Sequence, residues 1–216
     1  MNFLKNYSEN SHIRTYSRSN CAVFKKTKEE YGGLSNMSGG FPVKVNSISI
    51  RTSEALYQAC RFPHLPEIQR LIIDEKSPMA AKMKGKPYRV DSRSDWDQVR
   101  VKIMRWCLRV KLACNWFDFG SLLHATGNKP IVEESRRDRF WGAVTDREGT
   151  LVGNNVLGRL LMELREELKS EDITNLEIVK QPKINDFLLF DEPISEIYAD
   201  QEVKPTHFKP NQYDLF

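Results

Sequence analysis

The chain has 216 residues, of which 40% are hydrophobic, so it can bury one proper core, whereas two independent domains would be a tight fit. Lys and Arg number 33 against 29 Asp and Glu, and the resulting net charge of +4 neither requires nor excludes a nucleic-acid partner. No apolar run approaches the ~20 residues of a membrane span, and the polar N-terminus lacks the apolar core of a signal peptide. We therefore expect a cytoplasmic protein without a membrane segment.

Four cysteines form no CxxC pair, and the four histidines lack the spacing of metal ligands. The thiols are expected to be reduced and buried, as in a cytoplasmic protein. This pattern predicts no metal site. The cysteines are Cys21, Cys60, Cys107 and Cys114.

The first part of the chain predicts a flexible segment followed by strands. Residues 1–20 are polar and rich in Ser and Asn, so we expect little order there. Residues 21–24 favour a strand, a Tyr-Gly-Gly turn follows at 31–33, and the alternation over 41–50 predicts a β-hairpin.

Helical patterns dominate the next part of the chain. Thr52 or Ser53 is suited to cap one helix, and Ser77, which precedes a proline, predicts a short helix that runs to Lys82. The longest helix is predicted to begin at Ser94, with two aspartates in its first turn. Its apolar residues recur at steps of three and four and define one buried face: Trp96, Val99, Ile103, Trp106, Val110 and Cys114.

Two more helices are predicted over residues 118–125 and 155–168. After residue 169 the helical period is lost, and prolines and charges separate isolated apolar residues. We interpret 170–216 as a linker or loosely packed extension, ordered in part at most, with one strand-like piece at 187–190. The main domain is then expected to cover 21–169.

The stretch 134–142 combines charge with aromatic surface. Asp138 stands among arginines, and Phe140-Trp141-Gly142 begins two residues after it. An exposed ion pair, worth ~0–1 kcal/mol, is the simplest explanation of the carboxylate. The two aromatic residues are unusual for a solvated loop, however, and a carboxylate beside aromatic surface suits a flat, charged ligand such as a nucleotide.

Other candidate residues each have a structural alternative. Glu54 could serve only to complement its helix dipole, Trp96 could be core, and Lys82 could be a solvated charge. Asn155 could be a helix cap, although a helix that begins Gly-Asn-Asn also exposes N–H groups that suit a phosphate.

Several blocks of the chain, in order, resemble the NADAR family, which includes N-glycosidases of riboflavin intermediates. The resemblance covers about residues 22–168. The blocks are Leu34-Ser35-Asn36-Met37, residues 53–62 (SEALYQACRF), residues 77–82 (SPMAAK), Asp95-Trp96, residues 111–115, residues 132–135, Asp138, Trp141-Gly142 and residues 155–165.

This resemblance implies an α+β fold: a single compact, predominantly helical domain with a small N-terminal β-hairpin or sheet and no metal or redox cofactor. It also implies an N-glycosidase that acts on a ribose attached to a nitrogen. One branch of the family cleaves phosphoribosyl-aminopyrimidines, and the other removes ADP-ribose from guanine in nucleic acid and reverses a DNA ADP-ribosyltransferase toxin. Ala55-Leu56 stands where His-Tyr is usual, Met37 replaces Phe and Arg61 replaces Lys. These departures are more similar to the second branch.

The resemblance also implies roles. Cleavage of a C1′–N bond needs two carboxylates in different environments. Glu54 is expected to orient water or ribose hydroxyls, and Asp138 to act as the acid/base or to stabilise the cation, with the opposite assignment left open. Lys82 could instead form a Schiff base with an opened ribose.

The substrate-binding set has further members. Trp96 and Trp141 would stack on a base, while the Asn155 helix end and Arg137 or Arg139 would hold the diphosphate. The same motifs imply that Ser35, Asn36, Tyr57 and Gly142 belong to the substrate site.

The expected partner is ADP-ribose on guanine of single-stranded DNA. A toxin encoded alongside is a further expected partner. A basic rim of Lys82, Lys84, Lys86, Arg89 and Arg93 would accept the strand, although solvated charge is the simpler reading. The alternatives are a phosphoribosyl-aminopyrimidine substrate and a non-catalytic ADP-ribose-binding module, against which two carboxylates argue.

The C-terminal residues 212–216 resemble the short peptide with which bacterial DNA enzymes dock on the sliding clamp. Gln212, Leu215 and Phe216 would make that contact. The alternative is a hydrophobic tail that folds back on its own domain.

Overall fold

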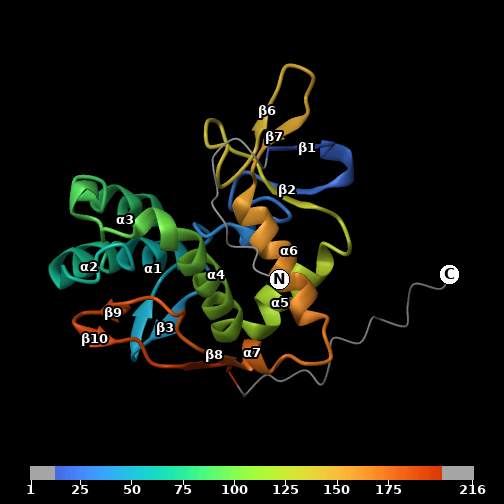
Figure 1. Ribbon diagram of the computed structural model, residues 1–216. Coiled ribbons are helices and arrows are strands. Elements are labelled where there is room, and N and C mark those ends of the chain that lie inside the picture. The colour runs from blue at the N-terminus through green and yellow to red at the C-terminus, as the bar shows by residue number, and fades with distance from the viewer. Residues whose placement is uncertain (1–12, 201–216) are drawn as a thin grey trace.

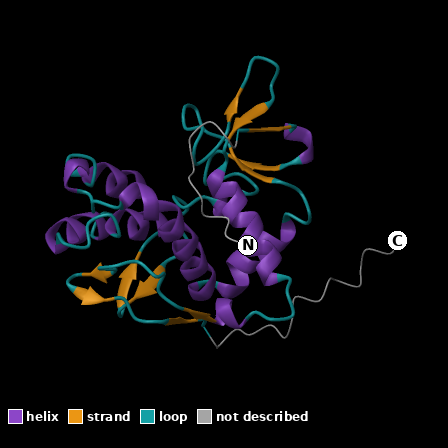
Figure 2. Cartoon of the chain, viewed as in Figure 1, coloured by secondary structure: helices purple, strands orange, loops and turns teal. Residues whose placement is uncertain are grey.

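Helices occupy the middle of the molecule and short strands lie at its edges (Figures 1 and 2). The structure, a computed structural model, describes residues 13–200. Its helices are α1 (Ser53–Ala59), α2 (Pro66–Ile73), α3 (Pro78–Lys84), α4 (Trp96–Cys114), α5 (Trp116–Ala125), α6 (Val156–Leu168) and α7 (Thr174–Glu177). Its strands are β1 (Arg14–Tyr16), β2 (Ala22–Phe24), β3 (Val43–Val45), β4 (Ile48–Ile50), β5 (Ile131–Glu133), β6 (Val144–Thr145), β7 (Leu151–Gly153), β8 (Ile178–Val179), β9 (Leu188–Leu189), β10 (Glu192–Pro193) and β11 (Ile197–Tyr198). The expected α+β class with mostly helical structure is confirmed.

Helix α4 is the central element, and α1, α5 and α6 pack against it. The predicted apolar face is buried, with Ile103 and Val110 fully inaccessible to solvent, except at its end, where Cys114 is half-buried. The helix begins at Trp96 after Asp95, two residues later than the sequence pattern predicts. Side-chain burial along this helix therefore supplies much of the hydrophobic driving force of the fold.

Helices α1, α2 and α3 form one lobe, and their caps position the first residues of α1 and α3. The Thr52 hydroxyl accepts a hydrogen bond from Ala55 N at 3.3 Å, and the Ser77 hydroxyl accepts one from Ala80 N at 3.4 Å. Both caps agree with the sequence-based expectation. Glu54 is thereby fixed in the first turn of α1, facing α3.

Strands β2 and β5 pair in parallel, and β1, β7 and β6 form an antiparallel sheet beside them. These strands make the upper lobe in Figure 1. The predicted hairpin at 41–50 is present as β3 and β4, joined by Asn46 and Ser47, which both have positive φ as a tight two-residue turn requires.

The two ends of the described chain are more ordered than the composition predicts. Residues 14–16 form β1, whose Tyr16 packs with Val132 and Leu151, so flexibility does not extend through residue 20. Residues 170–200 are likewise packed on the helices rather than forming a loose linker. Their buried side chains are Leu176, Val179, Phe187, Leu189, Ile194, Ile197 and Ala199.

One polar side chain fastens this C-terminal segment to the α1–α3 lobe. Gln69 of α2, which is fully buried, donates a hydrogen bond to Leu188 O at 3.0 Å and accepts one from Phe190 N at 2.7 Å. The strand-like piece expected at 187–190 is present as β9. The clamp-like residues Gln212, Leu215 and Phe216 lie outside the described residues.

All four cysteines are free, and Cys60 and Cys107 are buried. Within residues 13–200, no helix combines the length and the apolar character needed to span a membrane.

Candidate active site

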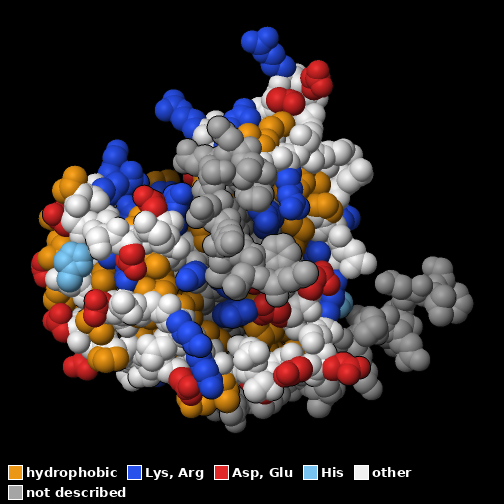
Figure 3. All heavy atoms as spheres, in the orientation of Figure 1, with side chains coloured by type: hydrophobic (Ala, Val, Ile, Leu, Met, Phe, Trp, Pro, Cys, Tyr) orange, Lys and Arg blue, Asp and Glu red, His pale blue; other side chains and the backbone are white. Residues whose placement is uncertain are grey.

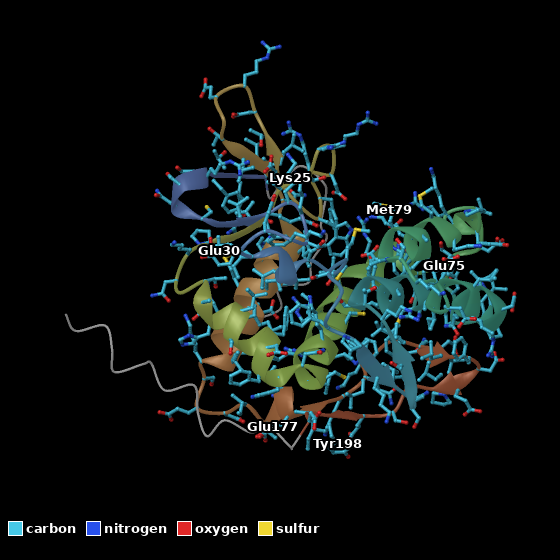
Figure 4. The ribbon with its side chains drawn as sticks, turned by 180° about the vertical axis from the view of Figure 1, so that it is seen from behind. Lys25, Glu30, Glu75, Met79, Glu177 and Tyr198 are labelled. Carbon is cyan, nitrogen blue, oxygen red and sulfur yellow. The ribbon has the colours of Figure 1, made fainter. Side chains whose placement is uncertain are left out.

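A cavity of about 700 Å³ lies between the α1–α3 lobe and the strand lobe. Figure 4 labels Lys25, which lines the cavity from the strand side, and Met79, which lies on α3. The cavity is lined by Lys25, Lys26, Ser35, Asn36, Met37, Glu54, Tyr57, Gln58, Arg61, Lys82, Arg89, Arg100, Met104, Glu133, Glu134, Ser135, Arg136, Asp138, Phe140, Trp141 and Leu157. Residues from distant parts of the sequence thus meet in one site, and seven of the expected ones are among them.

Glu54 lies in the cavity wall with a side chain that is only 9% exposed. Gln58, one turn further along α1, donates a hydrogen bond to Glu54 Oε1 at 2.9 Å. Lys82 Nζ lies 3.9 Å from the same oxygen. Two side chains, one polar and one cationic, thus contact the same carboxylate oxygen of Glu54.

Glu133, at the end of β5, also faces the cavity and was not singled out by the sequence. Burial, together with the negative charges of Glu54 and Asp138, raises its pKa to about 7, although Lys82 acts in the opposite direction. Glu133 therefore retains its proton to a pH well above the usual range of a glutamate. Two carboxyl groups with separated pKa values are what an acid/base pair requires.

Glu134, the next residue, has the opposite environment. Burial acts to raise its pKa, but hydrogen bonds from Arg18, Lys25 and Thr145 outweigh this effect and lower the pKa to about 2. The contacts measure 2.6 Å, 2.9 Å and 2.8 Å respectively. Glu134 thus holds the chain segments of Arg18, Lys25 and Thr145 against the cavity wall. It is not a candidate proton donor.

Asp138 is exposed and lines the cavity mouth. Its Oδ1 accepts hydrogen bonds from the N–H groups of Phe140 and Trp141, both at 2.9 Å, and its own N–H donates to Ser135 Oγ at 3.0 Å. One carboxylate oxygen therefore shapes the loop that presents the aromatic residues. These hydrogen bonds explain why the aspartate lies two residues before the aromatic pair.

The aromatic wall consists of Tyr57 and Trp141, whose ring centroids lie 5.7 Å apart. Trp96 lies behind Tyr57, with 5.1 Å between their ring centroids, and it does not line the cavity. Its position is therefore that of a core residue rather than of a side chain that stacks on the ligand. Two arginines pack on rings at the edge of this wall: Arg61 lies 4.4 Å from the Trp96 centroid and Arg100 lies 4.0 Å from that of Phe140.

Asn155 does not line the cavity, and the first three N–H groups at the helix end are already hydrogen-bonded to the protein. Its side chain is fully buried, accepting a hydrogen bond from Glu133 N at 3.1 Å and donating one to Ile131 O at 2.8 Å. The N–H groups of residues 155, 156 and 157 donate to the carbonyls of residues 142, 140 and 141. The phosphate role is therefore corrected: Asn155 positions the end of β5, and with it Glu133.

Gly142 has a similar supporting role. A Cβ atom at this position would lie 2.5 Å from Glu133 O, a distance that no side chain tolerates. Gly142 thus permits the close approach of its loop to β5 but does not contact the cavity.

Ser35 and Asn36 line the cavity as expected, yet their polar atoms are engaged in holding the wall. Ser53 Oγ donates to Asn36 Oδ1 at 3.0 Å, and Ser35 Oγ accepts from Met37 N at 3.2 Å. Behind them, the fully buried Lys111 donates to Gly33 O at 2.6 Å and Ser35 O at 3.0 Å.

The expected basic residues are only partly at the site. Arg136 lines the cavity, whereas Arg137 and Arg139 do not. Arg93 is buried and binds Asp95 and the carbonyl of Asn185, so it is not part of a basic rim. Lys82 and Arg89 do line the cavity.

The NADAR domain profile matches residues 23–169. This chain belongs to the NADAR family. N-glycosidase YbiA of Escherichia coli K12 is 36% identical over 151 residues, which cover 68% of this chain and 88% of that protein. Riboflavin biosynthesis protein PYRR, chloroplastic, of maize is 31% identical over 167 residues, which cover 69% of this chain and 25% of that protein. The NMR structure of E. coli YbiA matches with a TM-score of 0.60 and 30% identity over 81% of this chain and 96% of that chain.

Proposed function

We propose that this protein is an N-glycosidase that removes ADP-ribose from guanine in nucleic acid. Family membership and the relatives named N-glycosidase support hydrolysis of an N-glycosidic bond. The finer part of the proposal is that the substrate is ADP-ribosylguanine and that a toxin is the source of this modification.

One observation carries the proposal: a cluster of carboxyl groups lies within a ring of cations. The cationic side chains that line the cavity are Lys25, Lys26, Arg61, Lys82, Arg89, Arg100 and Arg136. A diphosphate needs several charge-assisted hydrogen bonds, and arginine supplies them in pairs. The cavity volume of about 700 Å³ also falls within the range of roughly 300–1,000 Å³ in which sites enclose ligands of drug size or larger.

The geometry supports a general acid different from the one that the sequence suggested. Guanine is a poor leaving group, so its nitrogen must gain a proton as the C1′–N bond breaks. Glu133 keeps a proton near neutrality and can supply it. Glu54 is the charged partner, which can stabilise the positive ribose, orient water toward C1′ and take the proton that this water releases.

Asp138 then acts as an anionic stabiliser at the cavity mouth rather than as the acid. Its exposure and its hydrogen bonds to Phe140 N and Trp141 N suit a fixed negative charge. Lys82, 3.9 Å from Glu54, balances the charge of that carboxylate in this scheme. The alternative imine route through Lys82 predicts a lysine adduct that borohydride reduction would trap during turnover.

A phosphoribosyl-aminopyrimidine remains the second candidate substrate, because two relatives are named as riboflavin biosynthesis proteins. That ligand carries a single phosphate, whereas cations line both sides of this cavity. Lys25 and Lys26 lie on the strand side, and Arg61 and Arg89 belong to the helical lobe. This distribution favours the larger, diphosphate-containing ligand.

The test is release of ADP-ribose from a single-stranded oligonucleotide that carries it on guanine. We expect wild type to release ADP-ribose and leave intact DNA, and Asp138→Asn to be at least tenfold slower, since the amide keeps the Oδ1 hydrogen bonds but loses the charge. Asp146→Asn is the matched control, because Asp146 Oδ1 also accepts two backbone N–H groups of its own turn, yet does not line the cavity.

Tight binding of free ADP-ribose without any release would instead identify a non-catalytic ADP-ribose-binding module. Full activity of Asp138→Asn would show that Asp138 does not take part in catalysis.

A further inference from the structure

Helix α3 and the 3-10 helix η3 (Arg89–Asp91) expose large apolar side chains to solvent. Met79 is 56% exposed, Met83 is 50% exposed and Val90 is 90% exposed. Met79 and Met83 are four residues apart on α3 and therefore project from the same face of the helix. Figure 4 shows Met79 on the outside of α3, on the lobe that faces the strands bearing Lys25.

This surface continues directly into the cavity. Lys82 precedes Met83, Arg89 precedes Val90, and both cations line the cavity. The exposed apolar side chains therefore belong to the same segment of the chain as two cations of the cavity.

The charge of the same stretch restricts what can bind there. Residues 76–90 contain five Lys or Arg and no Asp or Glu. Lys84 is paired with Glu75 at 3.3 Å, while Lys86 is exposed. Figure 3 shows Lys and Arg side chains over the upper left of the molecule, where α3 lies, and also lower on the same face. A purely apolar partner would gain nothing from these charges.

Apolar side chains interleaved with cations are the features by which proteins hold single-stranded nucleic acid. The cations follow the phosphates, and flat bases pack on exposed side chains without regard to sequence. Methionine is suited to such contacts because its unbranched, polarisable side chain adapts to different rings.

We propose that the α3 rim, which consists of Met79, Met83, Lys86, Arg89 and Val90, binds the nucleotides that flank the modified guanine. This inference rests on the proposed function, since it takes a strand as the substrate. A base in the cavity must leave its stack, and its neighbours then need another surface to cover their faces. The α3 rim provides that surface: its Met83 follows Lys82 in the chain, and its Arg89 lines the cavity.

The experiment compares two substrates that differ only in length: ADP-ribosylated guanosine and a 12-nucleotide single strand with the same modified base. We expect wild type to have a much higher kcat/KM on the strand. Met79→Ser/Met83→Ser should lose about 5- to 100-fold on the strand, the range for loss of stacking on one base, and remain unchanged on the nucleoside. Lys86→Ala should lower affinity for the strand and reduce its dependence on salt.

The control is Phe117→Ser, which removes another exposed apolar side chain, 52% accessible, from the distant helix α5. Because all these side chains are exposed, thermal melting curves should be unchanged, and a loss of folding would be visible in them. Fluorescence anisotropy with an unmodified strand measures the α3 rim without any turnover.

The outcomes separate the two claims. Equal kcat/KM of wild type on the nucleoside and the strand, or unchanged strand binding by the methionine variant, would overturn the α3 rim while leaving the glycosidase intact. Failure of wild type to cleave either guanine substrate would overturn the proposed function. In that case, weaker anisotropy binding by the methionine variant would still support the α3 rim as a nucleic-acid surface.

Discussion

Glu133 and Glu134 are adjacent in the chain, but the fold gives their carboxyl groups opposite properties. The pKa of Glu133 rises to about 7 because its side chain is buried near two other acids. The pKa of Glu134 falls to about 2 because the hydrogen bonds from Arg18, Lys25 and Thr145 outweigh its burial. The first is suited to donate a proton and the second to hold three segments together.

We predict that Glu133→Gln lowers kcat by at least ~100-fold, the usual contribution of a general acid. The wild-type rate should fall as pH rises through about 7, because the ionised carboxylate has no proton to give. The residual activity of the variant should lack this step. Measurement of kcat between pH 5.5 and 8.5 tests the assignment, and a wild-type-like profile in the variant would rule Glu133 out.

The same carboxyl group should make stability depend on pH. Because the folded-state pKa of Glu133 is raised from 4.5 to about 7, its favourable contribution is fully present below pH 4.5 and is lost as pH rises through 7. Urea unfolding at pH 5 and pH 7.5 should therefore show a smaller loss of free energy of unfolding in Glu133→Gln than in wild type. An identical loss in both proteins would contradict the shifted pKa.

The sequence could identify Glu54, Lys82 and Asp138 because recognisable motifs surround them. It could not identify Glu133, because its pKa is raised by burial and then by the charges of Glu54 and Asp138, and only the folded chain creates these surroundings. It also placed Asn155 and Trp96 too close to the ligand, since a motif shows that a residue matters but not whether it touches the substrate.

At the scale of elements, the end of β5 and the start of α6 form the joint that positions Glu133. Asn155 has a φ of 48°, which asparagine tolerates better than most residues, and its amide bridges Glu133 N and Ile131 O. Gly158 is needed at the same joint, since a Cβ there would collide with Ile131 O.

We predict that Asn155→Ala lowers the free energy of unfolding by ~1–3 kcal/mol, because two buried hydrogen bonds are lost and the positive φ is disfavoured for alanine. Asn155→Gly relieves the backbone conformation but not the lost bonds, so its thermal melting temperature should lie between those of Asn155→Ala and wild type. Both variants should also lose activity through misplacement of Glu133. An alanine variant as stable and active as wild type would argue against the joint.

Element prediction succeeded where the pattern is local. The caps at Thr52 and Ser77, the α4 period and the β3–β4 turn are all set by neighbouring residues. The packing of residues 170–200 could not be predicted in this way, because each apolar side chain there is buried by a different distant element, as Gln69 shows for β9. Such a segment has no period of its own.

At the scale of the molecule, the cavity lies where two lobes meet, and neither lobe alone contains the acid pair. Glu54 and Lys82 come from the helical lobe, whereas Glu133 and Asp138 come from the strand lobe and its loop. The surrounding cations also come from both lobes. The fold therefore creates the separation of pKa values and the anion-binding surface at the same place.

The most direct measurement is the ratio of wild-type kcat/KM for a guanine-ADP-ribosylated single strand to that for a phosphoribosyl-aminopyrimidine, determined in one buffer at pH 6.5. Our account predicts a ratio far above one, together with a loss of at least ~100-fold on the strand in Glu133→Gln. A ratio below one would assign the cavity to the small metabolite and contradict the proposed substrate.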